Sequence, residues 1–217
     1  VTGVQTCALP ISLAQVKAAA AETNAALGLL TNEQRDLIVR AADEVVAGTL
    51  DGEFPLSVWQ TGSGTQSNMN VNEVIASRAN EIATGSRGGK SPIHPNDHVN
   101  LSQSSNDAFP TAIHMAAYAA VSGELIPALE HLRGAIATKA KGWESIVKIG
   151  RTHLQDAVPM TLGQEFGAHA SALAADIARI EASLLDLRKL ALGGTAVSTG
   201  QNSHPDLAKR AVAAIAK

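Results

Sequence analysis

Apolar side chains recur at helical spacing along most of the chain, and polar loops interrupt this pattern at a few places. Steps of three and four residues put apolar side chains on one face of a helix, as expected for a helix packed on a core. At the second helix, Thr31 and Gln34 have the spacing of a capping box, in which each side chain bonds the other's backbone amide. The pattern predicts helices over residues 13–30, about 32–48, about 71–83 and from about 108 onward.

The longest apolar pattern lies toward the C-terminal end of the sequence. A second capping box, Thr161 with Gln164, precedes a seam whose apolar positions alternate steps of four and three. Its larger side chains would each contribute about 1.5–3 kcal/mol on burial, so the helix that carries them needs partner helices. The seam consists of Phe166, Ala170, Leu173, Ile177, Ile180, Leu184, Leu187 and Ala191.

The elements predict a mainly α fold in two parts. Residues 145–160 are rich in β-branched side chains and contain Pro159, which favours a short extended excursion between helices. Only residues 205–217 follow the seam as a further helical segment, so we expect the chain to be cut short within a bundle. The expected parts are an N-terminal helical domain with long loops, residues 13–103 and incomplete at its start, and a truncated central long-helix bundle, residues 104–217.

The first twelve residues, VTGVQTCALPIS, differ from the rest of the chain. They carry no charge and hold the only cysteine, Cys7. No Lys or Arg precedes Lys17, so the basic start of a secretory signal peptide is missing. Residues 1–11 can be back-translated into a common short-read sequencing adapter. We therefore expect residues 1–12 to be an adapter artefact and exclude them from the reasoning about the fold.

Composition narrows the classes of function. Lys and Arg number 17 against 20 Asp and Glu, and a net charge of −3 argues against a surface that follows nucleic-acid phosphates. Apolar residues make up 45% and aromatic residues 3%, a balance that favours packed helices. We find no apolar stretch near the roughly 20 residues of a membrane span, and one cysteine forms no disulfide framework. The expectation is a cytoplasmic protein that binds neither nucleic acid nor membrane.

Three polar loops concentrate small hydrogen-bond donors. Each alone has the composition of ordinary caps and turns, but several convergent donors at helix N-termini would suit a carboxylate ligand. His153 lies in polar company beside Thr152, as a general acid or base would. His94 and His98 have the spacing of a helical metal pair, but Pro95 between them indicates a loop, so no metal site is expected. The loops are Ser63-Gly64-Thr65, Ser104-Ser105-Asn106 and Thr152-His153.

A family resemblance rests on four longer motifs. QTGSGTQSNMNVNEV, HPNDHVNLSQSSNDAFPTA, KIGRTHLQDAVPMTLGQE and ALGGTAVSTG resemble, in order and spacing, the class II fumarate hydratases of the fumarase/aspartase superfamily. The resemblance runs from about Leu13 to Lys217 and covers about half of a family chain. It implies a mostly helical subunit whose long-helix bundles form a homotetramer, with each active site assembled from several subunits. It also implies fumarate and malate as substrates and no cofactor.

The resemblance assigns roles to individual residues. His153 would act on the hydroxyl side, activating water for addition to fumarate or helping it leave malate. The HPND stretch resembles a second dicarboxylate site made of His94, Asn96 and Asp97. Some relatives have an arginine three residues before this histidine, where Ser91 stands here. The residues that would hold the substrate carboxylates are Ser63, Gly64, Thr65, Ser104, Ser105, Asn106 and Thr152.

Two alternatives stay open beside a fumarate hydratase. Aspartate ammonia-lyases share much of the pattern but resemble HPNN, SQSTND and GRTQ at the three places where this chain has Asp97, Ser105 and His153. A non-catalytic, dicarboxylate-binding helical scaffold is the other alternative. The family's loop of the form G-S-S-x-M-P-x-K-x-N, with its catalytic serine and its lysine, does not occur in the chain. We therefore expect these 217 residues to be inactive and to aggregate through the open seam.

Overall fold

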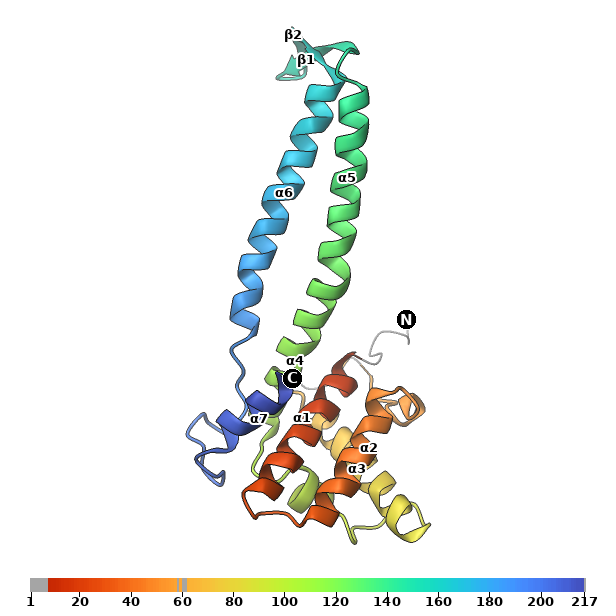
Figure 1. Ribbon diagram of the computed structural model, residues 1–217, viewed down its shortest axis with the longest axis vertical. Coiled ribbons are helices and arrows are strands. Elements are labelled where there is room, and N and C mark those ends of the chain that lie inside the picture. The colour runs from red at the N-terminus through yellow and green to blue at the C-terminus, as the bar shows by residue number, and fades with distance from the viewer. Residues whose placement is uncertain (1–7, 58, 60–61, 217) are drawn as a thin grey trace. The chain divides into compact units, whose positions relative to one another are not determined.

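The computed structural model describes residues 8–57, 59 and 62–216, and the fold is mainly α, as predicted (Figure 1). Residues 1–7, which include Cys7, lie outside the described residues. The chain forms two compact units, residues 1–116 with 190–217, and residues 117–189. The division of the protein into domains at residues 103 and 104, and the adapter origin of residues 1–12, stay predictions.

The first unit is built around its first helix. Helix α1 (Ala8–Ala26) contacts α2 (Asn32–Val46), α3 (Thr65–Thr84) and α7 (Leu207–Ile215). A short 3-10 turn (Asp51–Glu53), a π-helical turn (Pro95–Val99) and the start of α4 (Ser105–Ala120) complete the unit. Several large apolar side chains are completely buried in its core: Leu13, Val16, Ile38, Ile75, Ile93 and Leu207.

Local sequence rules account for some helix ends and miss others. The capping box at α2 is confirmed, because the Gln34 amide donates to Thr31 Oγ1 and the Thr31 amide donates to Gln34 Oε1, both at 3.1 Å. Helix α1 begins at Ala8 rather than at Leu13 and ends at Ala26 rather than at Leu30, and Gly28 follows it with a positive φ of 77°. Helix α3 begins at Thr65 rather than near residue 71, because its first turns bury polar side chains that an apolar pattern does not reveal.

The second unit is a helical hairpin with a β-hairpin between its long helices. After the end of α4 and a π-helical turn (Val121–Leu125), α5 (Ile126–Gly142) runs to the strands β1 (Val147–Thr152) and β2 (Gln155–Thr161). The strands pair antiparallel, which confirms the predicted extended excursion. Helix α6 (Leu162–Leu187) then packs along α5, as Figure 1 shows.

The predicted seam lies on the side of α6 that is least exposed. Its middle residues Ile177 and Leu184 are buried, and most of its other members are half-buried. The seam is shorter than predicted by one position, since α6 ends at Leu187 and Ala191 is exposed beyond it. The capping box at α6 is confirmed: the Gln164 amide donates to Thr161 Oγ1 at 3.0 Å, and the Thr161 amide donates to Gln164 Oε1 at 2.9 Å.

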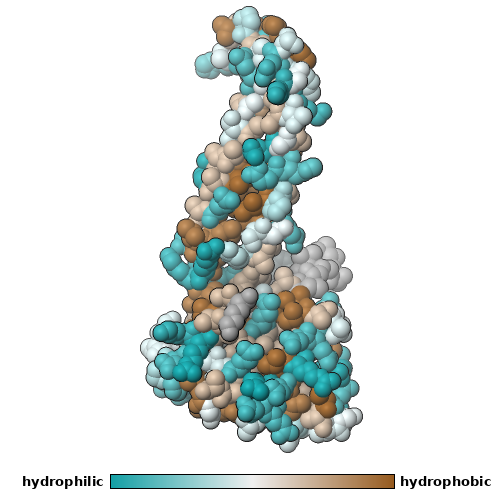
Figure 2. Space-filling view, viewed as in Figure 1, coloured by the Kyte–Doolittle hydropathy of each residue, from teal (hydrophilic) through white to brown (hydrophobic). Residues whose placement is uncertain are grey.

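The hairpin leaves much apolar surface uncovered. Leu125, Leu132 and Leu185 are 44–58% exposed, and apolar side chains are visible along the long helices in Figure 2. The helical run Ser105–Gly142 is long and apolar enough, by length and composition, to cross a membrane, since it contains an 18-residue window with a mean hydropathy of 1.3. The expectation that no such stretch exists was wrong, because polar residues interrupt the apolar ones in this run and still leave the mean hydropathy of one window high. Core helices of bundles pass the same test.

Candidate active site

A glycine fixes the first of the three predicted loops. Gly64 precedes α3 with a φ of +70°, a conformation that side-chain-bearing residues rarely adopt. A Cβ atom at Gly64 would lie 2.1 Å from the ring of Phe109 on α4. The loop therefore approaches the first turns of α4 as closely as a glycine allows. On either side of Gly64, the hydroxyl oxygens of Ser63 and Thr65 lie 3.2 Å apart, and both residues are exposed.

The second predicted loop caps α4. The Asn106 amide donates to Ser104 Oγ at 3.2 Å, so Ser104 serves as a cap. The Asn106 side-chain amide donates to the Ala196 carbonyl at 2.8 Å. Both side chains therefore make protein contacts that fix the loop. Each side chain keeps further hydrogen-bonding capacity beyond these contacts, and its binding of a carboxylate stays a prediction.

A single asparagine joins the two loops. Asn68, on α3 and 1% exposed, donates through Nδ2 to Ser105 Oγ at 3.0 Å. The N-terminal turns of α3 and α4 thus lie side by side, and both direct the positive ends of their dipoles toward the predicted loops. Because the Ser105 oxygen accepts from Asn68, its hydroxyl proton is directed to another acceptor, such as a bound carboxylate.

Asp107 was missed by the sequence reasoning. This buried carboxylate accepts from the Ser104 amide at 2.9 Å, and from the Gly193 and Thr195 amides at 3.0 and 2.8 Å. It therefore ties the loop after α6 to the start of α4. The signal was present in the sequence, since an acidic residue three positions after a capping serine is a known helix-start pattern.

Lys17 was missed as well. It is fully buried on α1, and burial lowers the pKa of its ammonium to about 7, with the Asp107 charge acting in the opposite direction. The signal is a lysine inside an otherwise apolar helical stretch, LAQVKAAAA. Its ammonium donates hydrogen bonds to the side chains of Asn100 and Gln103, just before the second predicted loop.

Thr152 and His153 lie at the tip of the β-hairpin, in the second unit. Strand β1 ends at Thr152, and His153 and Leu154 form the two-residue turn with φ values of 50° and 64°. Both Thr152 and His153 are exposed. The structure thus brings Ser63, Thr65 and Ser105 together within the first unit and leaves His153 to a separate unit. The catalytic role of His153 stays a prediction.

The residues of the predicted second dicarboxylate site share one turn. His94 Nδ1 accepts from the amides of Asn96 and Asp97 at 3.2 and 3.1 Å, so the imidazole caps the turn Pro95–Val99. The His94 amide donates to His98 Nδ1 at 2.9 Å. Burial lowers the pKa of His98, an effect opposed by the Asp97 charge and reinforced by His94. The turn is thus well fixed, and its binding role stays a prediction.

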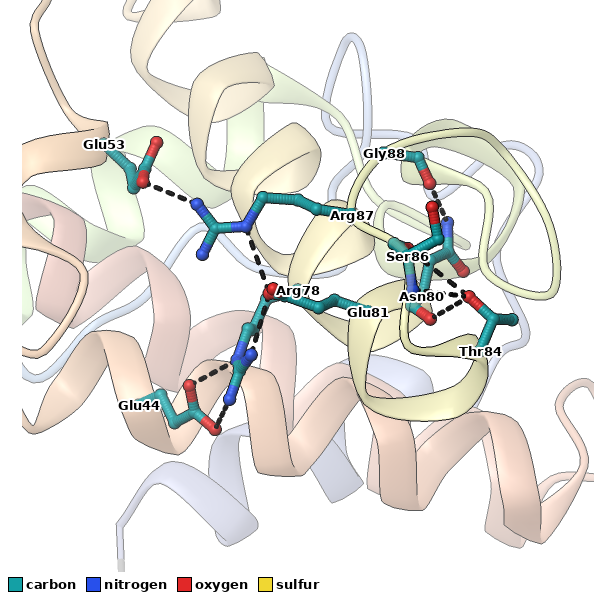
Figure 3. Close-up of polar contacts among 9 residues, drawn as sticks. All are labelled: Glu44, Glu53, Arg78, Asn80, Glu81, Thr84, Ser86, Arg87 and Gly88. Atoms are coloured by element: carbon teal, nitrogen blue, oxygen red, sulfur yellow. Dashed lines mark hydrogen bonds and ion pairs between the residues drawn. The ribbon is translucent and has the colours of Figure 1, made fainter.

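A charge network supports the loop that leads to this turn (Figure 3). Arg78 contacts Glu44 at 2.6 Å and Glu81 at 2.7 Å, while Arg87 contacts Glu81 at 3.0 Å and Glu53 at 2.8 Å. Hydrogen bonds from Arg78 and then Arg87 lower the pKa of Glu81. Since each guanidinium is matched by carboxylates, the network serves to fix the loop and offers little attraction to an anion.

A neighbouring asparagine holds the same loop by its backbone. Asn80 Oδ1 accepts from the Ile93 amide at 2.8 Å, and Asn80 Nδ2 donates to the Ile93 carbonyl at 3.0 Å. Throughout the described residues, no group of three or more His, Cys, Asp and Glu side chains could hold a metal ion.

Comparisons with known proteins agree with this geometry. A family model described as a lyase matches residues 5–217. The chain is 59% identical over 206 residues to the class II fumarate hydratase of Neisseria meningitidis. The aligned residues cover 95% of this chain and 45% of that protein. It is 60% identical over 206 residues to the class II fumarate hydratase of Methylorubrum extorquens, covering 95% of this chain and 44% of that protein. The chain spans about half the length of the curated relatives it matches.

Solved structures show the same relationship. The crystal structure of a class II fumarase from Schistosoma mansoni matches with a TM-score of 0.92 at 46% identity, over 97% of this chain and 44% of that chain. A cobalt-bound fumarate lyase:delta crystallin from Brucella melitensis matches with a TM-score of 0.93 at 44% identity, over 96% of this chain and 45% of that chain. These matches confirm the expected fold class. The chain belongs to this lyase family, within the fumarase/aspartase superfamily, and its relatives there include the class II fumarate hydratases.

Proposed function

We propose that the complete protein is a fumarate hydratase, which adds water reversibly to fumarate to give (S)-malate in the tricarboxylic acid cycle. The observation that carries this proposal is the junction of α3 and α4, where Asn68 donates to Ser105 Oγ and leaves the serine hydroxyl to donate outward. The names of the relatives at 59% and 60% identity support the choice of substrate.

The chemistry of the reaction fits a site made of neutral donors. Removal of a proton from the carbon next to a carboxylate places two negative charges on that group, and preorganised donors stabilise them. We propose that Ser63, Gly64, Thr65, Ser104, Ser105, Asn106 and Thr152 hold the substrate carboxylates. Two helix N-termini add fixed positive potential at the same place.

We propose that His153 acts on the water molecule. In hydration, its imidazole would accept a proton from water as the oxygen forms a bond to one alkene carbon, and the other carbon would receive a proton from a second group. The family loop with its serine, which this chain does not contain, would supply that group. His153 lies at an exposed hairpin tip, where it can serve a site completed by another part of the assembly.

The assembly we propose is a soluble, cytoplasmic homotetramer. The exposed leucines on α5 and α6 support this proposal, because a bundle with more helices would cover them. Further copies of the chain would provide those helices. They would also bring hairpin tips to sites in other subunits. We propose in addition that His94, Asn96 and Asp97 form a second dicarboxylate site.

The experiment that tests the function is an assay of the complete protein. The source gene is read beyond Lys217, the complete protein is purified, and fumarate is followed by ultraviolet absorbance with malate and with aspartate as substrates. We expect turnover of malate and none of aspartate. Turnover of aspartate would show an ammonia-lyase, and dicarboxylate binding without turnover would show a scaffold.

A matched pair of variants tests the role of His153. His153→Gln should lower malate dehydration by about a hundredfold or more, the usual contribution of a positioned general base. His131→Gln is the control, because His131 is an exposed histidine on α5. An unchanged rate in His153→Gln would remove the assigned role.

A further inference from the structure

Among the described residues, the buried ammonium of Lys17 forms no ion pair, although the charge of Asp107 acts on it. A lysine is seldom fully buried unless its charge is paired. The lysines that form ion pairs among the described residues are Lys148 and Lys189. The Lys17 ammonium instead donates to two amide oxygens, Asn100 Oδ1 at 2.8 Å and Gln103 Oε1 at 3.0 Å. Burying this charge costs free energy, so we expect Lys17 to have a function that offsets the cost.

One branch of these hydrogen bonds leads to the proposed carboxylate site. Asn100 Oδ1 accepts from Lys17 and also from Asn68 Nδ2, at 3.2 Å. Asn68 Nδ2 donates in addition to Ser105 Oγ at 3.0 Å. Both protons of the Asn68 amide nitrogen are thus used, one toward Asn100 and one toward Ser105. Lys17 therefore fixes the orientation of the group that orients Ser105.

The other branch fixes the backbone just before the site. Gln103 Nε2 donates to the Val99 carbonyl at 3.1 Å and to the Leu101 carbonyl at 3.2 Å. Asn100 Nδ2 donates to the Gln103 carbonyl at 3.3 Å. The segment from Val99 to Gln103 thus folds around the ammonium of Lys17. The next residue begins the loop that caps α4.

We propose that Lys17 is a positioning residue of the carboxylate site, which holds Asn100 and, through Asn68, sets the Ser105 hydroxyl to donate to a substrate carboxylate. This inference rests on the proposed function. Lys17 does not touch the substrate in this scheme. It acts by fixing the donors and by placing one positive charge beneath the N-terminus of α4.

The charge state of Lys17 makes dicarboxylate affinity depend on pH. A purely structural role of Lys17 would not produce this pH dependence. Burial lowers its pKa to about 7, against the effect of Asp107, and no charged group described on α2, α3, α7 or the turn Pro95–Val99 contributes to the shift. A bound dicarboxylate favours the protonated ammonium, so binding should take up a proton. By linkage, dicarboxylate affinity should fall as pH rises above about 7.

The test compares two lysine variants of the complete protein. Lys17→Met keeps an unbranched side chain one atom shorter and removes its charge, and Lys209→Met is the control on an exposed lysine of the same unit. KM and kcat for fumarate are measured between about pH 6 and pH 9. We expect Lys17→Met to raise KM about tenfold near pH 6.5, with a smaller change in kcat, because a hydrogen bond supported by charge is lost. Its KM should also lose the rise above about pH 7 that the wild type and Lys209→Met show.

A folded Lys17→Met protein with wild-type KM and wild-type pH dependence would overturn the inference while leaving the proposed function in place. Absence of turnover in both wild type and Lys209→Met would overturn the two together. If Lys17→Met does not fold, calorimetry of succinate binding in buffers of different ionisation enthalpy replaces it, with His153→Asn as the protein so that this histidine does not contribute. Proton uptake near pH 8 supports the inference, and its absence overturns it.

Discussion

The two compact units of this chain bury their apolar side chains to very different extents. In the first unit, Ile38, Ile75 and Ile93 are completely inaccessible to solvent, and polar side chains such as Asn68 are buried with them. In the second unit, the seam of α6 has only two buried members, Ile177 and Leu184. The first unit obtains its core from its own residues. The second is a helical hairpin that leaves large apolar side chains such as Leu132 and Leu185 about half exposed.

The largest expected effect is the loss in free energy of unfolding when an apolar side chain of the first unit, rather than of the second, is truncated. Ile75→Ala removes a completely buried side chain from the first unit and should lower the free energy of unfolding by about 2–5 kcal/mol. Leu185→Ala removes a side chain that is 58% exposed and should change it by less than about 0.5 kcal/mol. Urea denaturation of the chain followed by circular dichroism measures both. Equal effects would show that the second unit is packed as tightly as the first.

A second prediction concerns the pH dependence of the first unit. The pKa of Lys17 is about 7 in the fold and 10.5 when unfolded, so the unfolded chain binds more protons between these values. Stability from this group should therefore rise as pH increases from about 7 toward 10.5, by at most about 1.4 kcal/mol per pH unit. Below pH 7 both states are protonated, and the full cost of burying the charge remains. Denaturation of wild type and Lys17→Met at several pH values should show this rise in the wild type alone.

A smaller effect is expected at the junction of α3 and α4. Gly64→Ala places a side chain at a positive φ, which costs about 1–2 kcal/mol, and adds a close contact with Phe109. Gly62→Ala is the control, because a Cβ atom there meets nothing within 4 Å. In thermal unfolding, the melting temperature of Gly64→Ala should be well below that of Gly62→Ala. The double variant with Phe109→Ala should recover the part of the loss that comes from the contact.

The smallest effect is expected at the charge network. Glu81→Gln removes the carboxylate between Arg78 and Arg87, at a half-buried surface position where solvent still screens the ion pairs. Because the pKa of Glu81 is lowered in the fold, its contribution should be present at neutral pH and disappear as pH falls through the acid range. Thermal unfolding at neutral and acid pH, with and without salt, measures it. A loss that persists at acid pH would mean that the glutamine disturbs the packing.

The sequence predicted those features that depend on neighbouring residues. Both capping boxes need only residues three apart, and the α6 seam needs only a regular period, so each was found before the structure. The start of α3 was missed because its inner face carries Asn68 and Asn72, which are polar. Ala191 was assigned to the seam because an apolar period does not show where a helix stops.

The residues that organise the candidate site from beneath could not be found in the same way. Lys17 and Asn100 are 83 positions apart, and Asp107 and Thr195 are 88 positions apart. Such pairs leave no periodic signal, and a single lysine or aspartate has many possible partners. The family motifs did identify Ser63, Ser105 and Asn106 as candidates, and the structure adds the partner of each, namely Thr65, Asn68 and the Ala196 carbonyl.

The attachment of the 193–195 loop to Asp107 has a consequence for synthesis of the protein on the ribosome. Helix α7, whose Leu207 and Ala211 are buried, and the loop held by Asp107 both belong to the first unit, although residues 117–189 intervene. At common translation rates, these intervening residues take roughly 4–15 s to be made. During that time α1 emerges without α7 to cover it. The nascent chain therefore exposes one side of its first helix until the last residues of the unit are released.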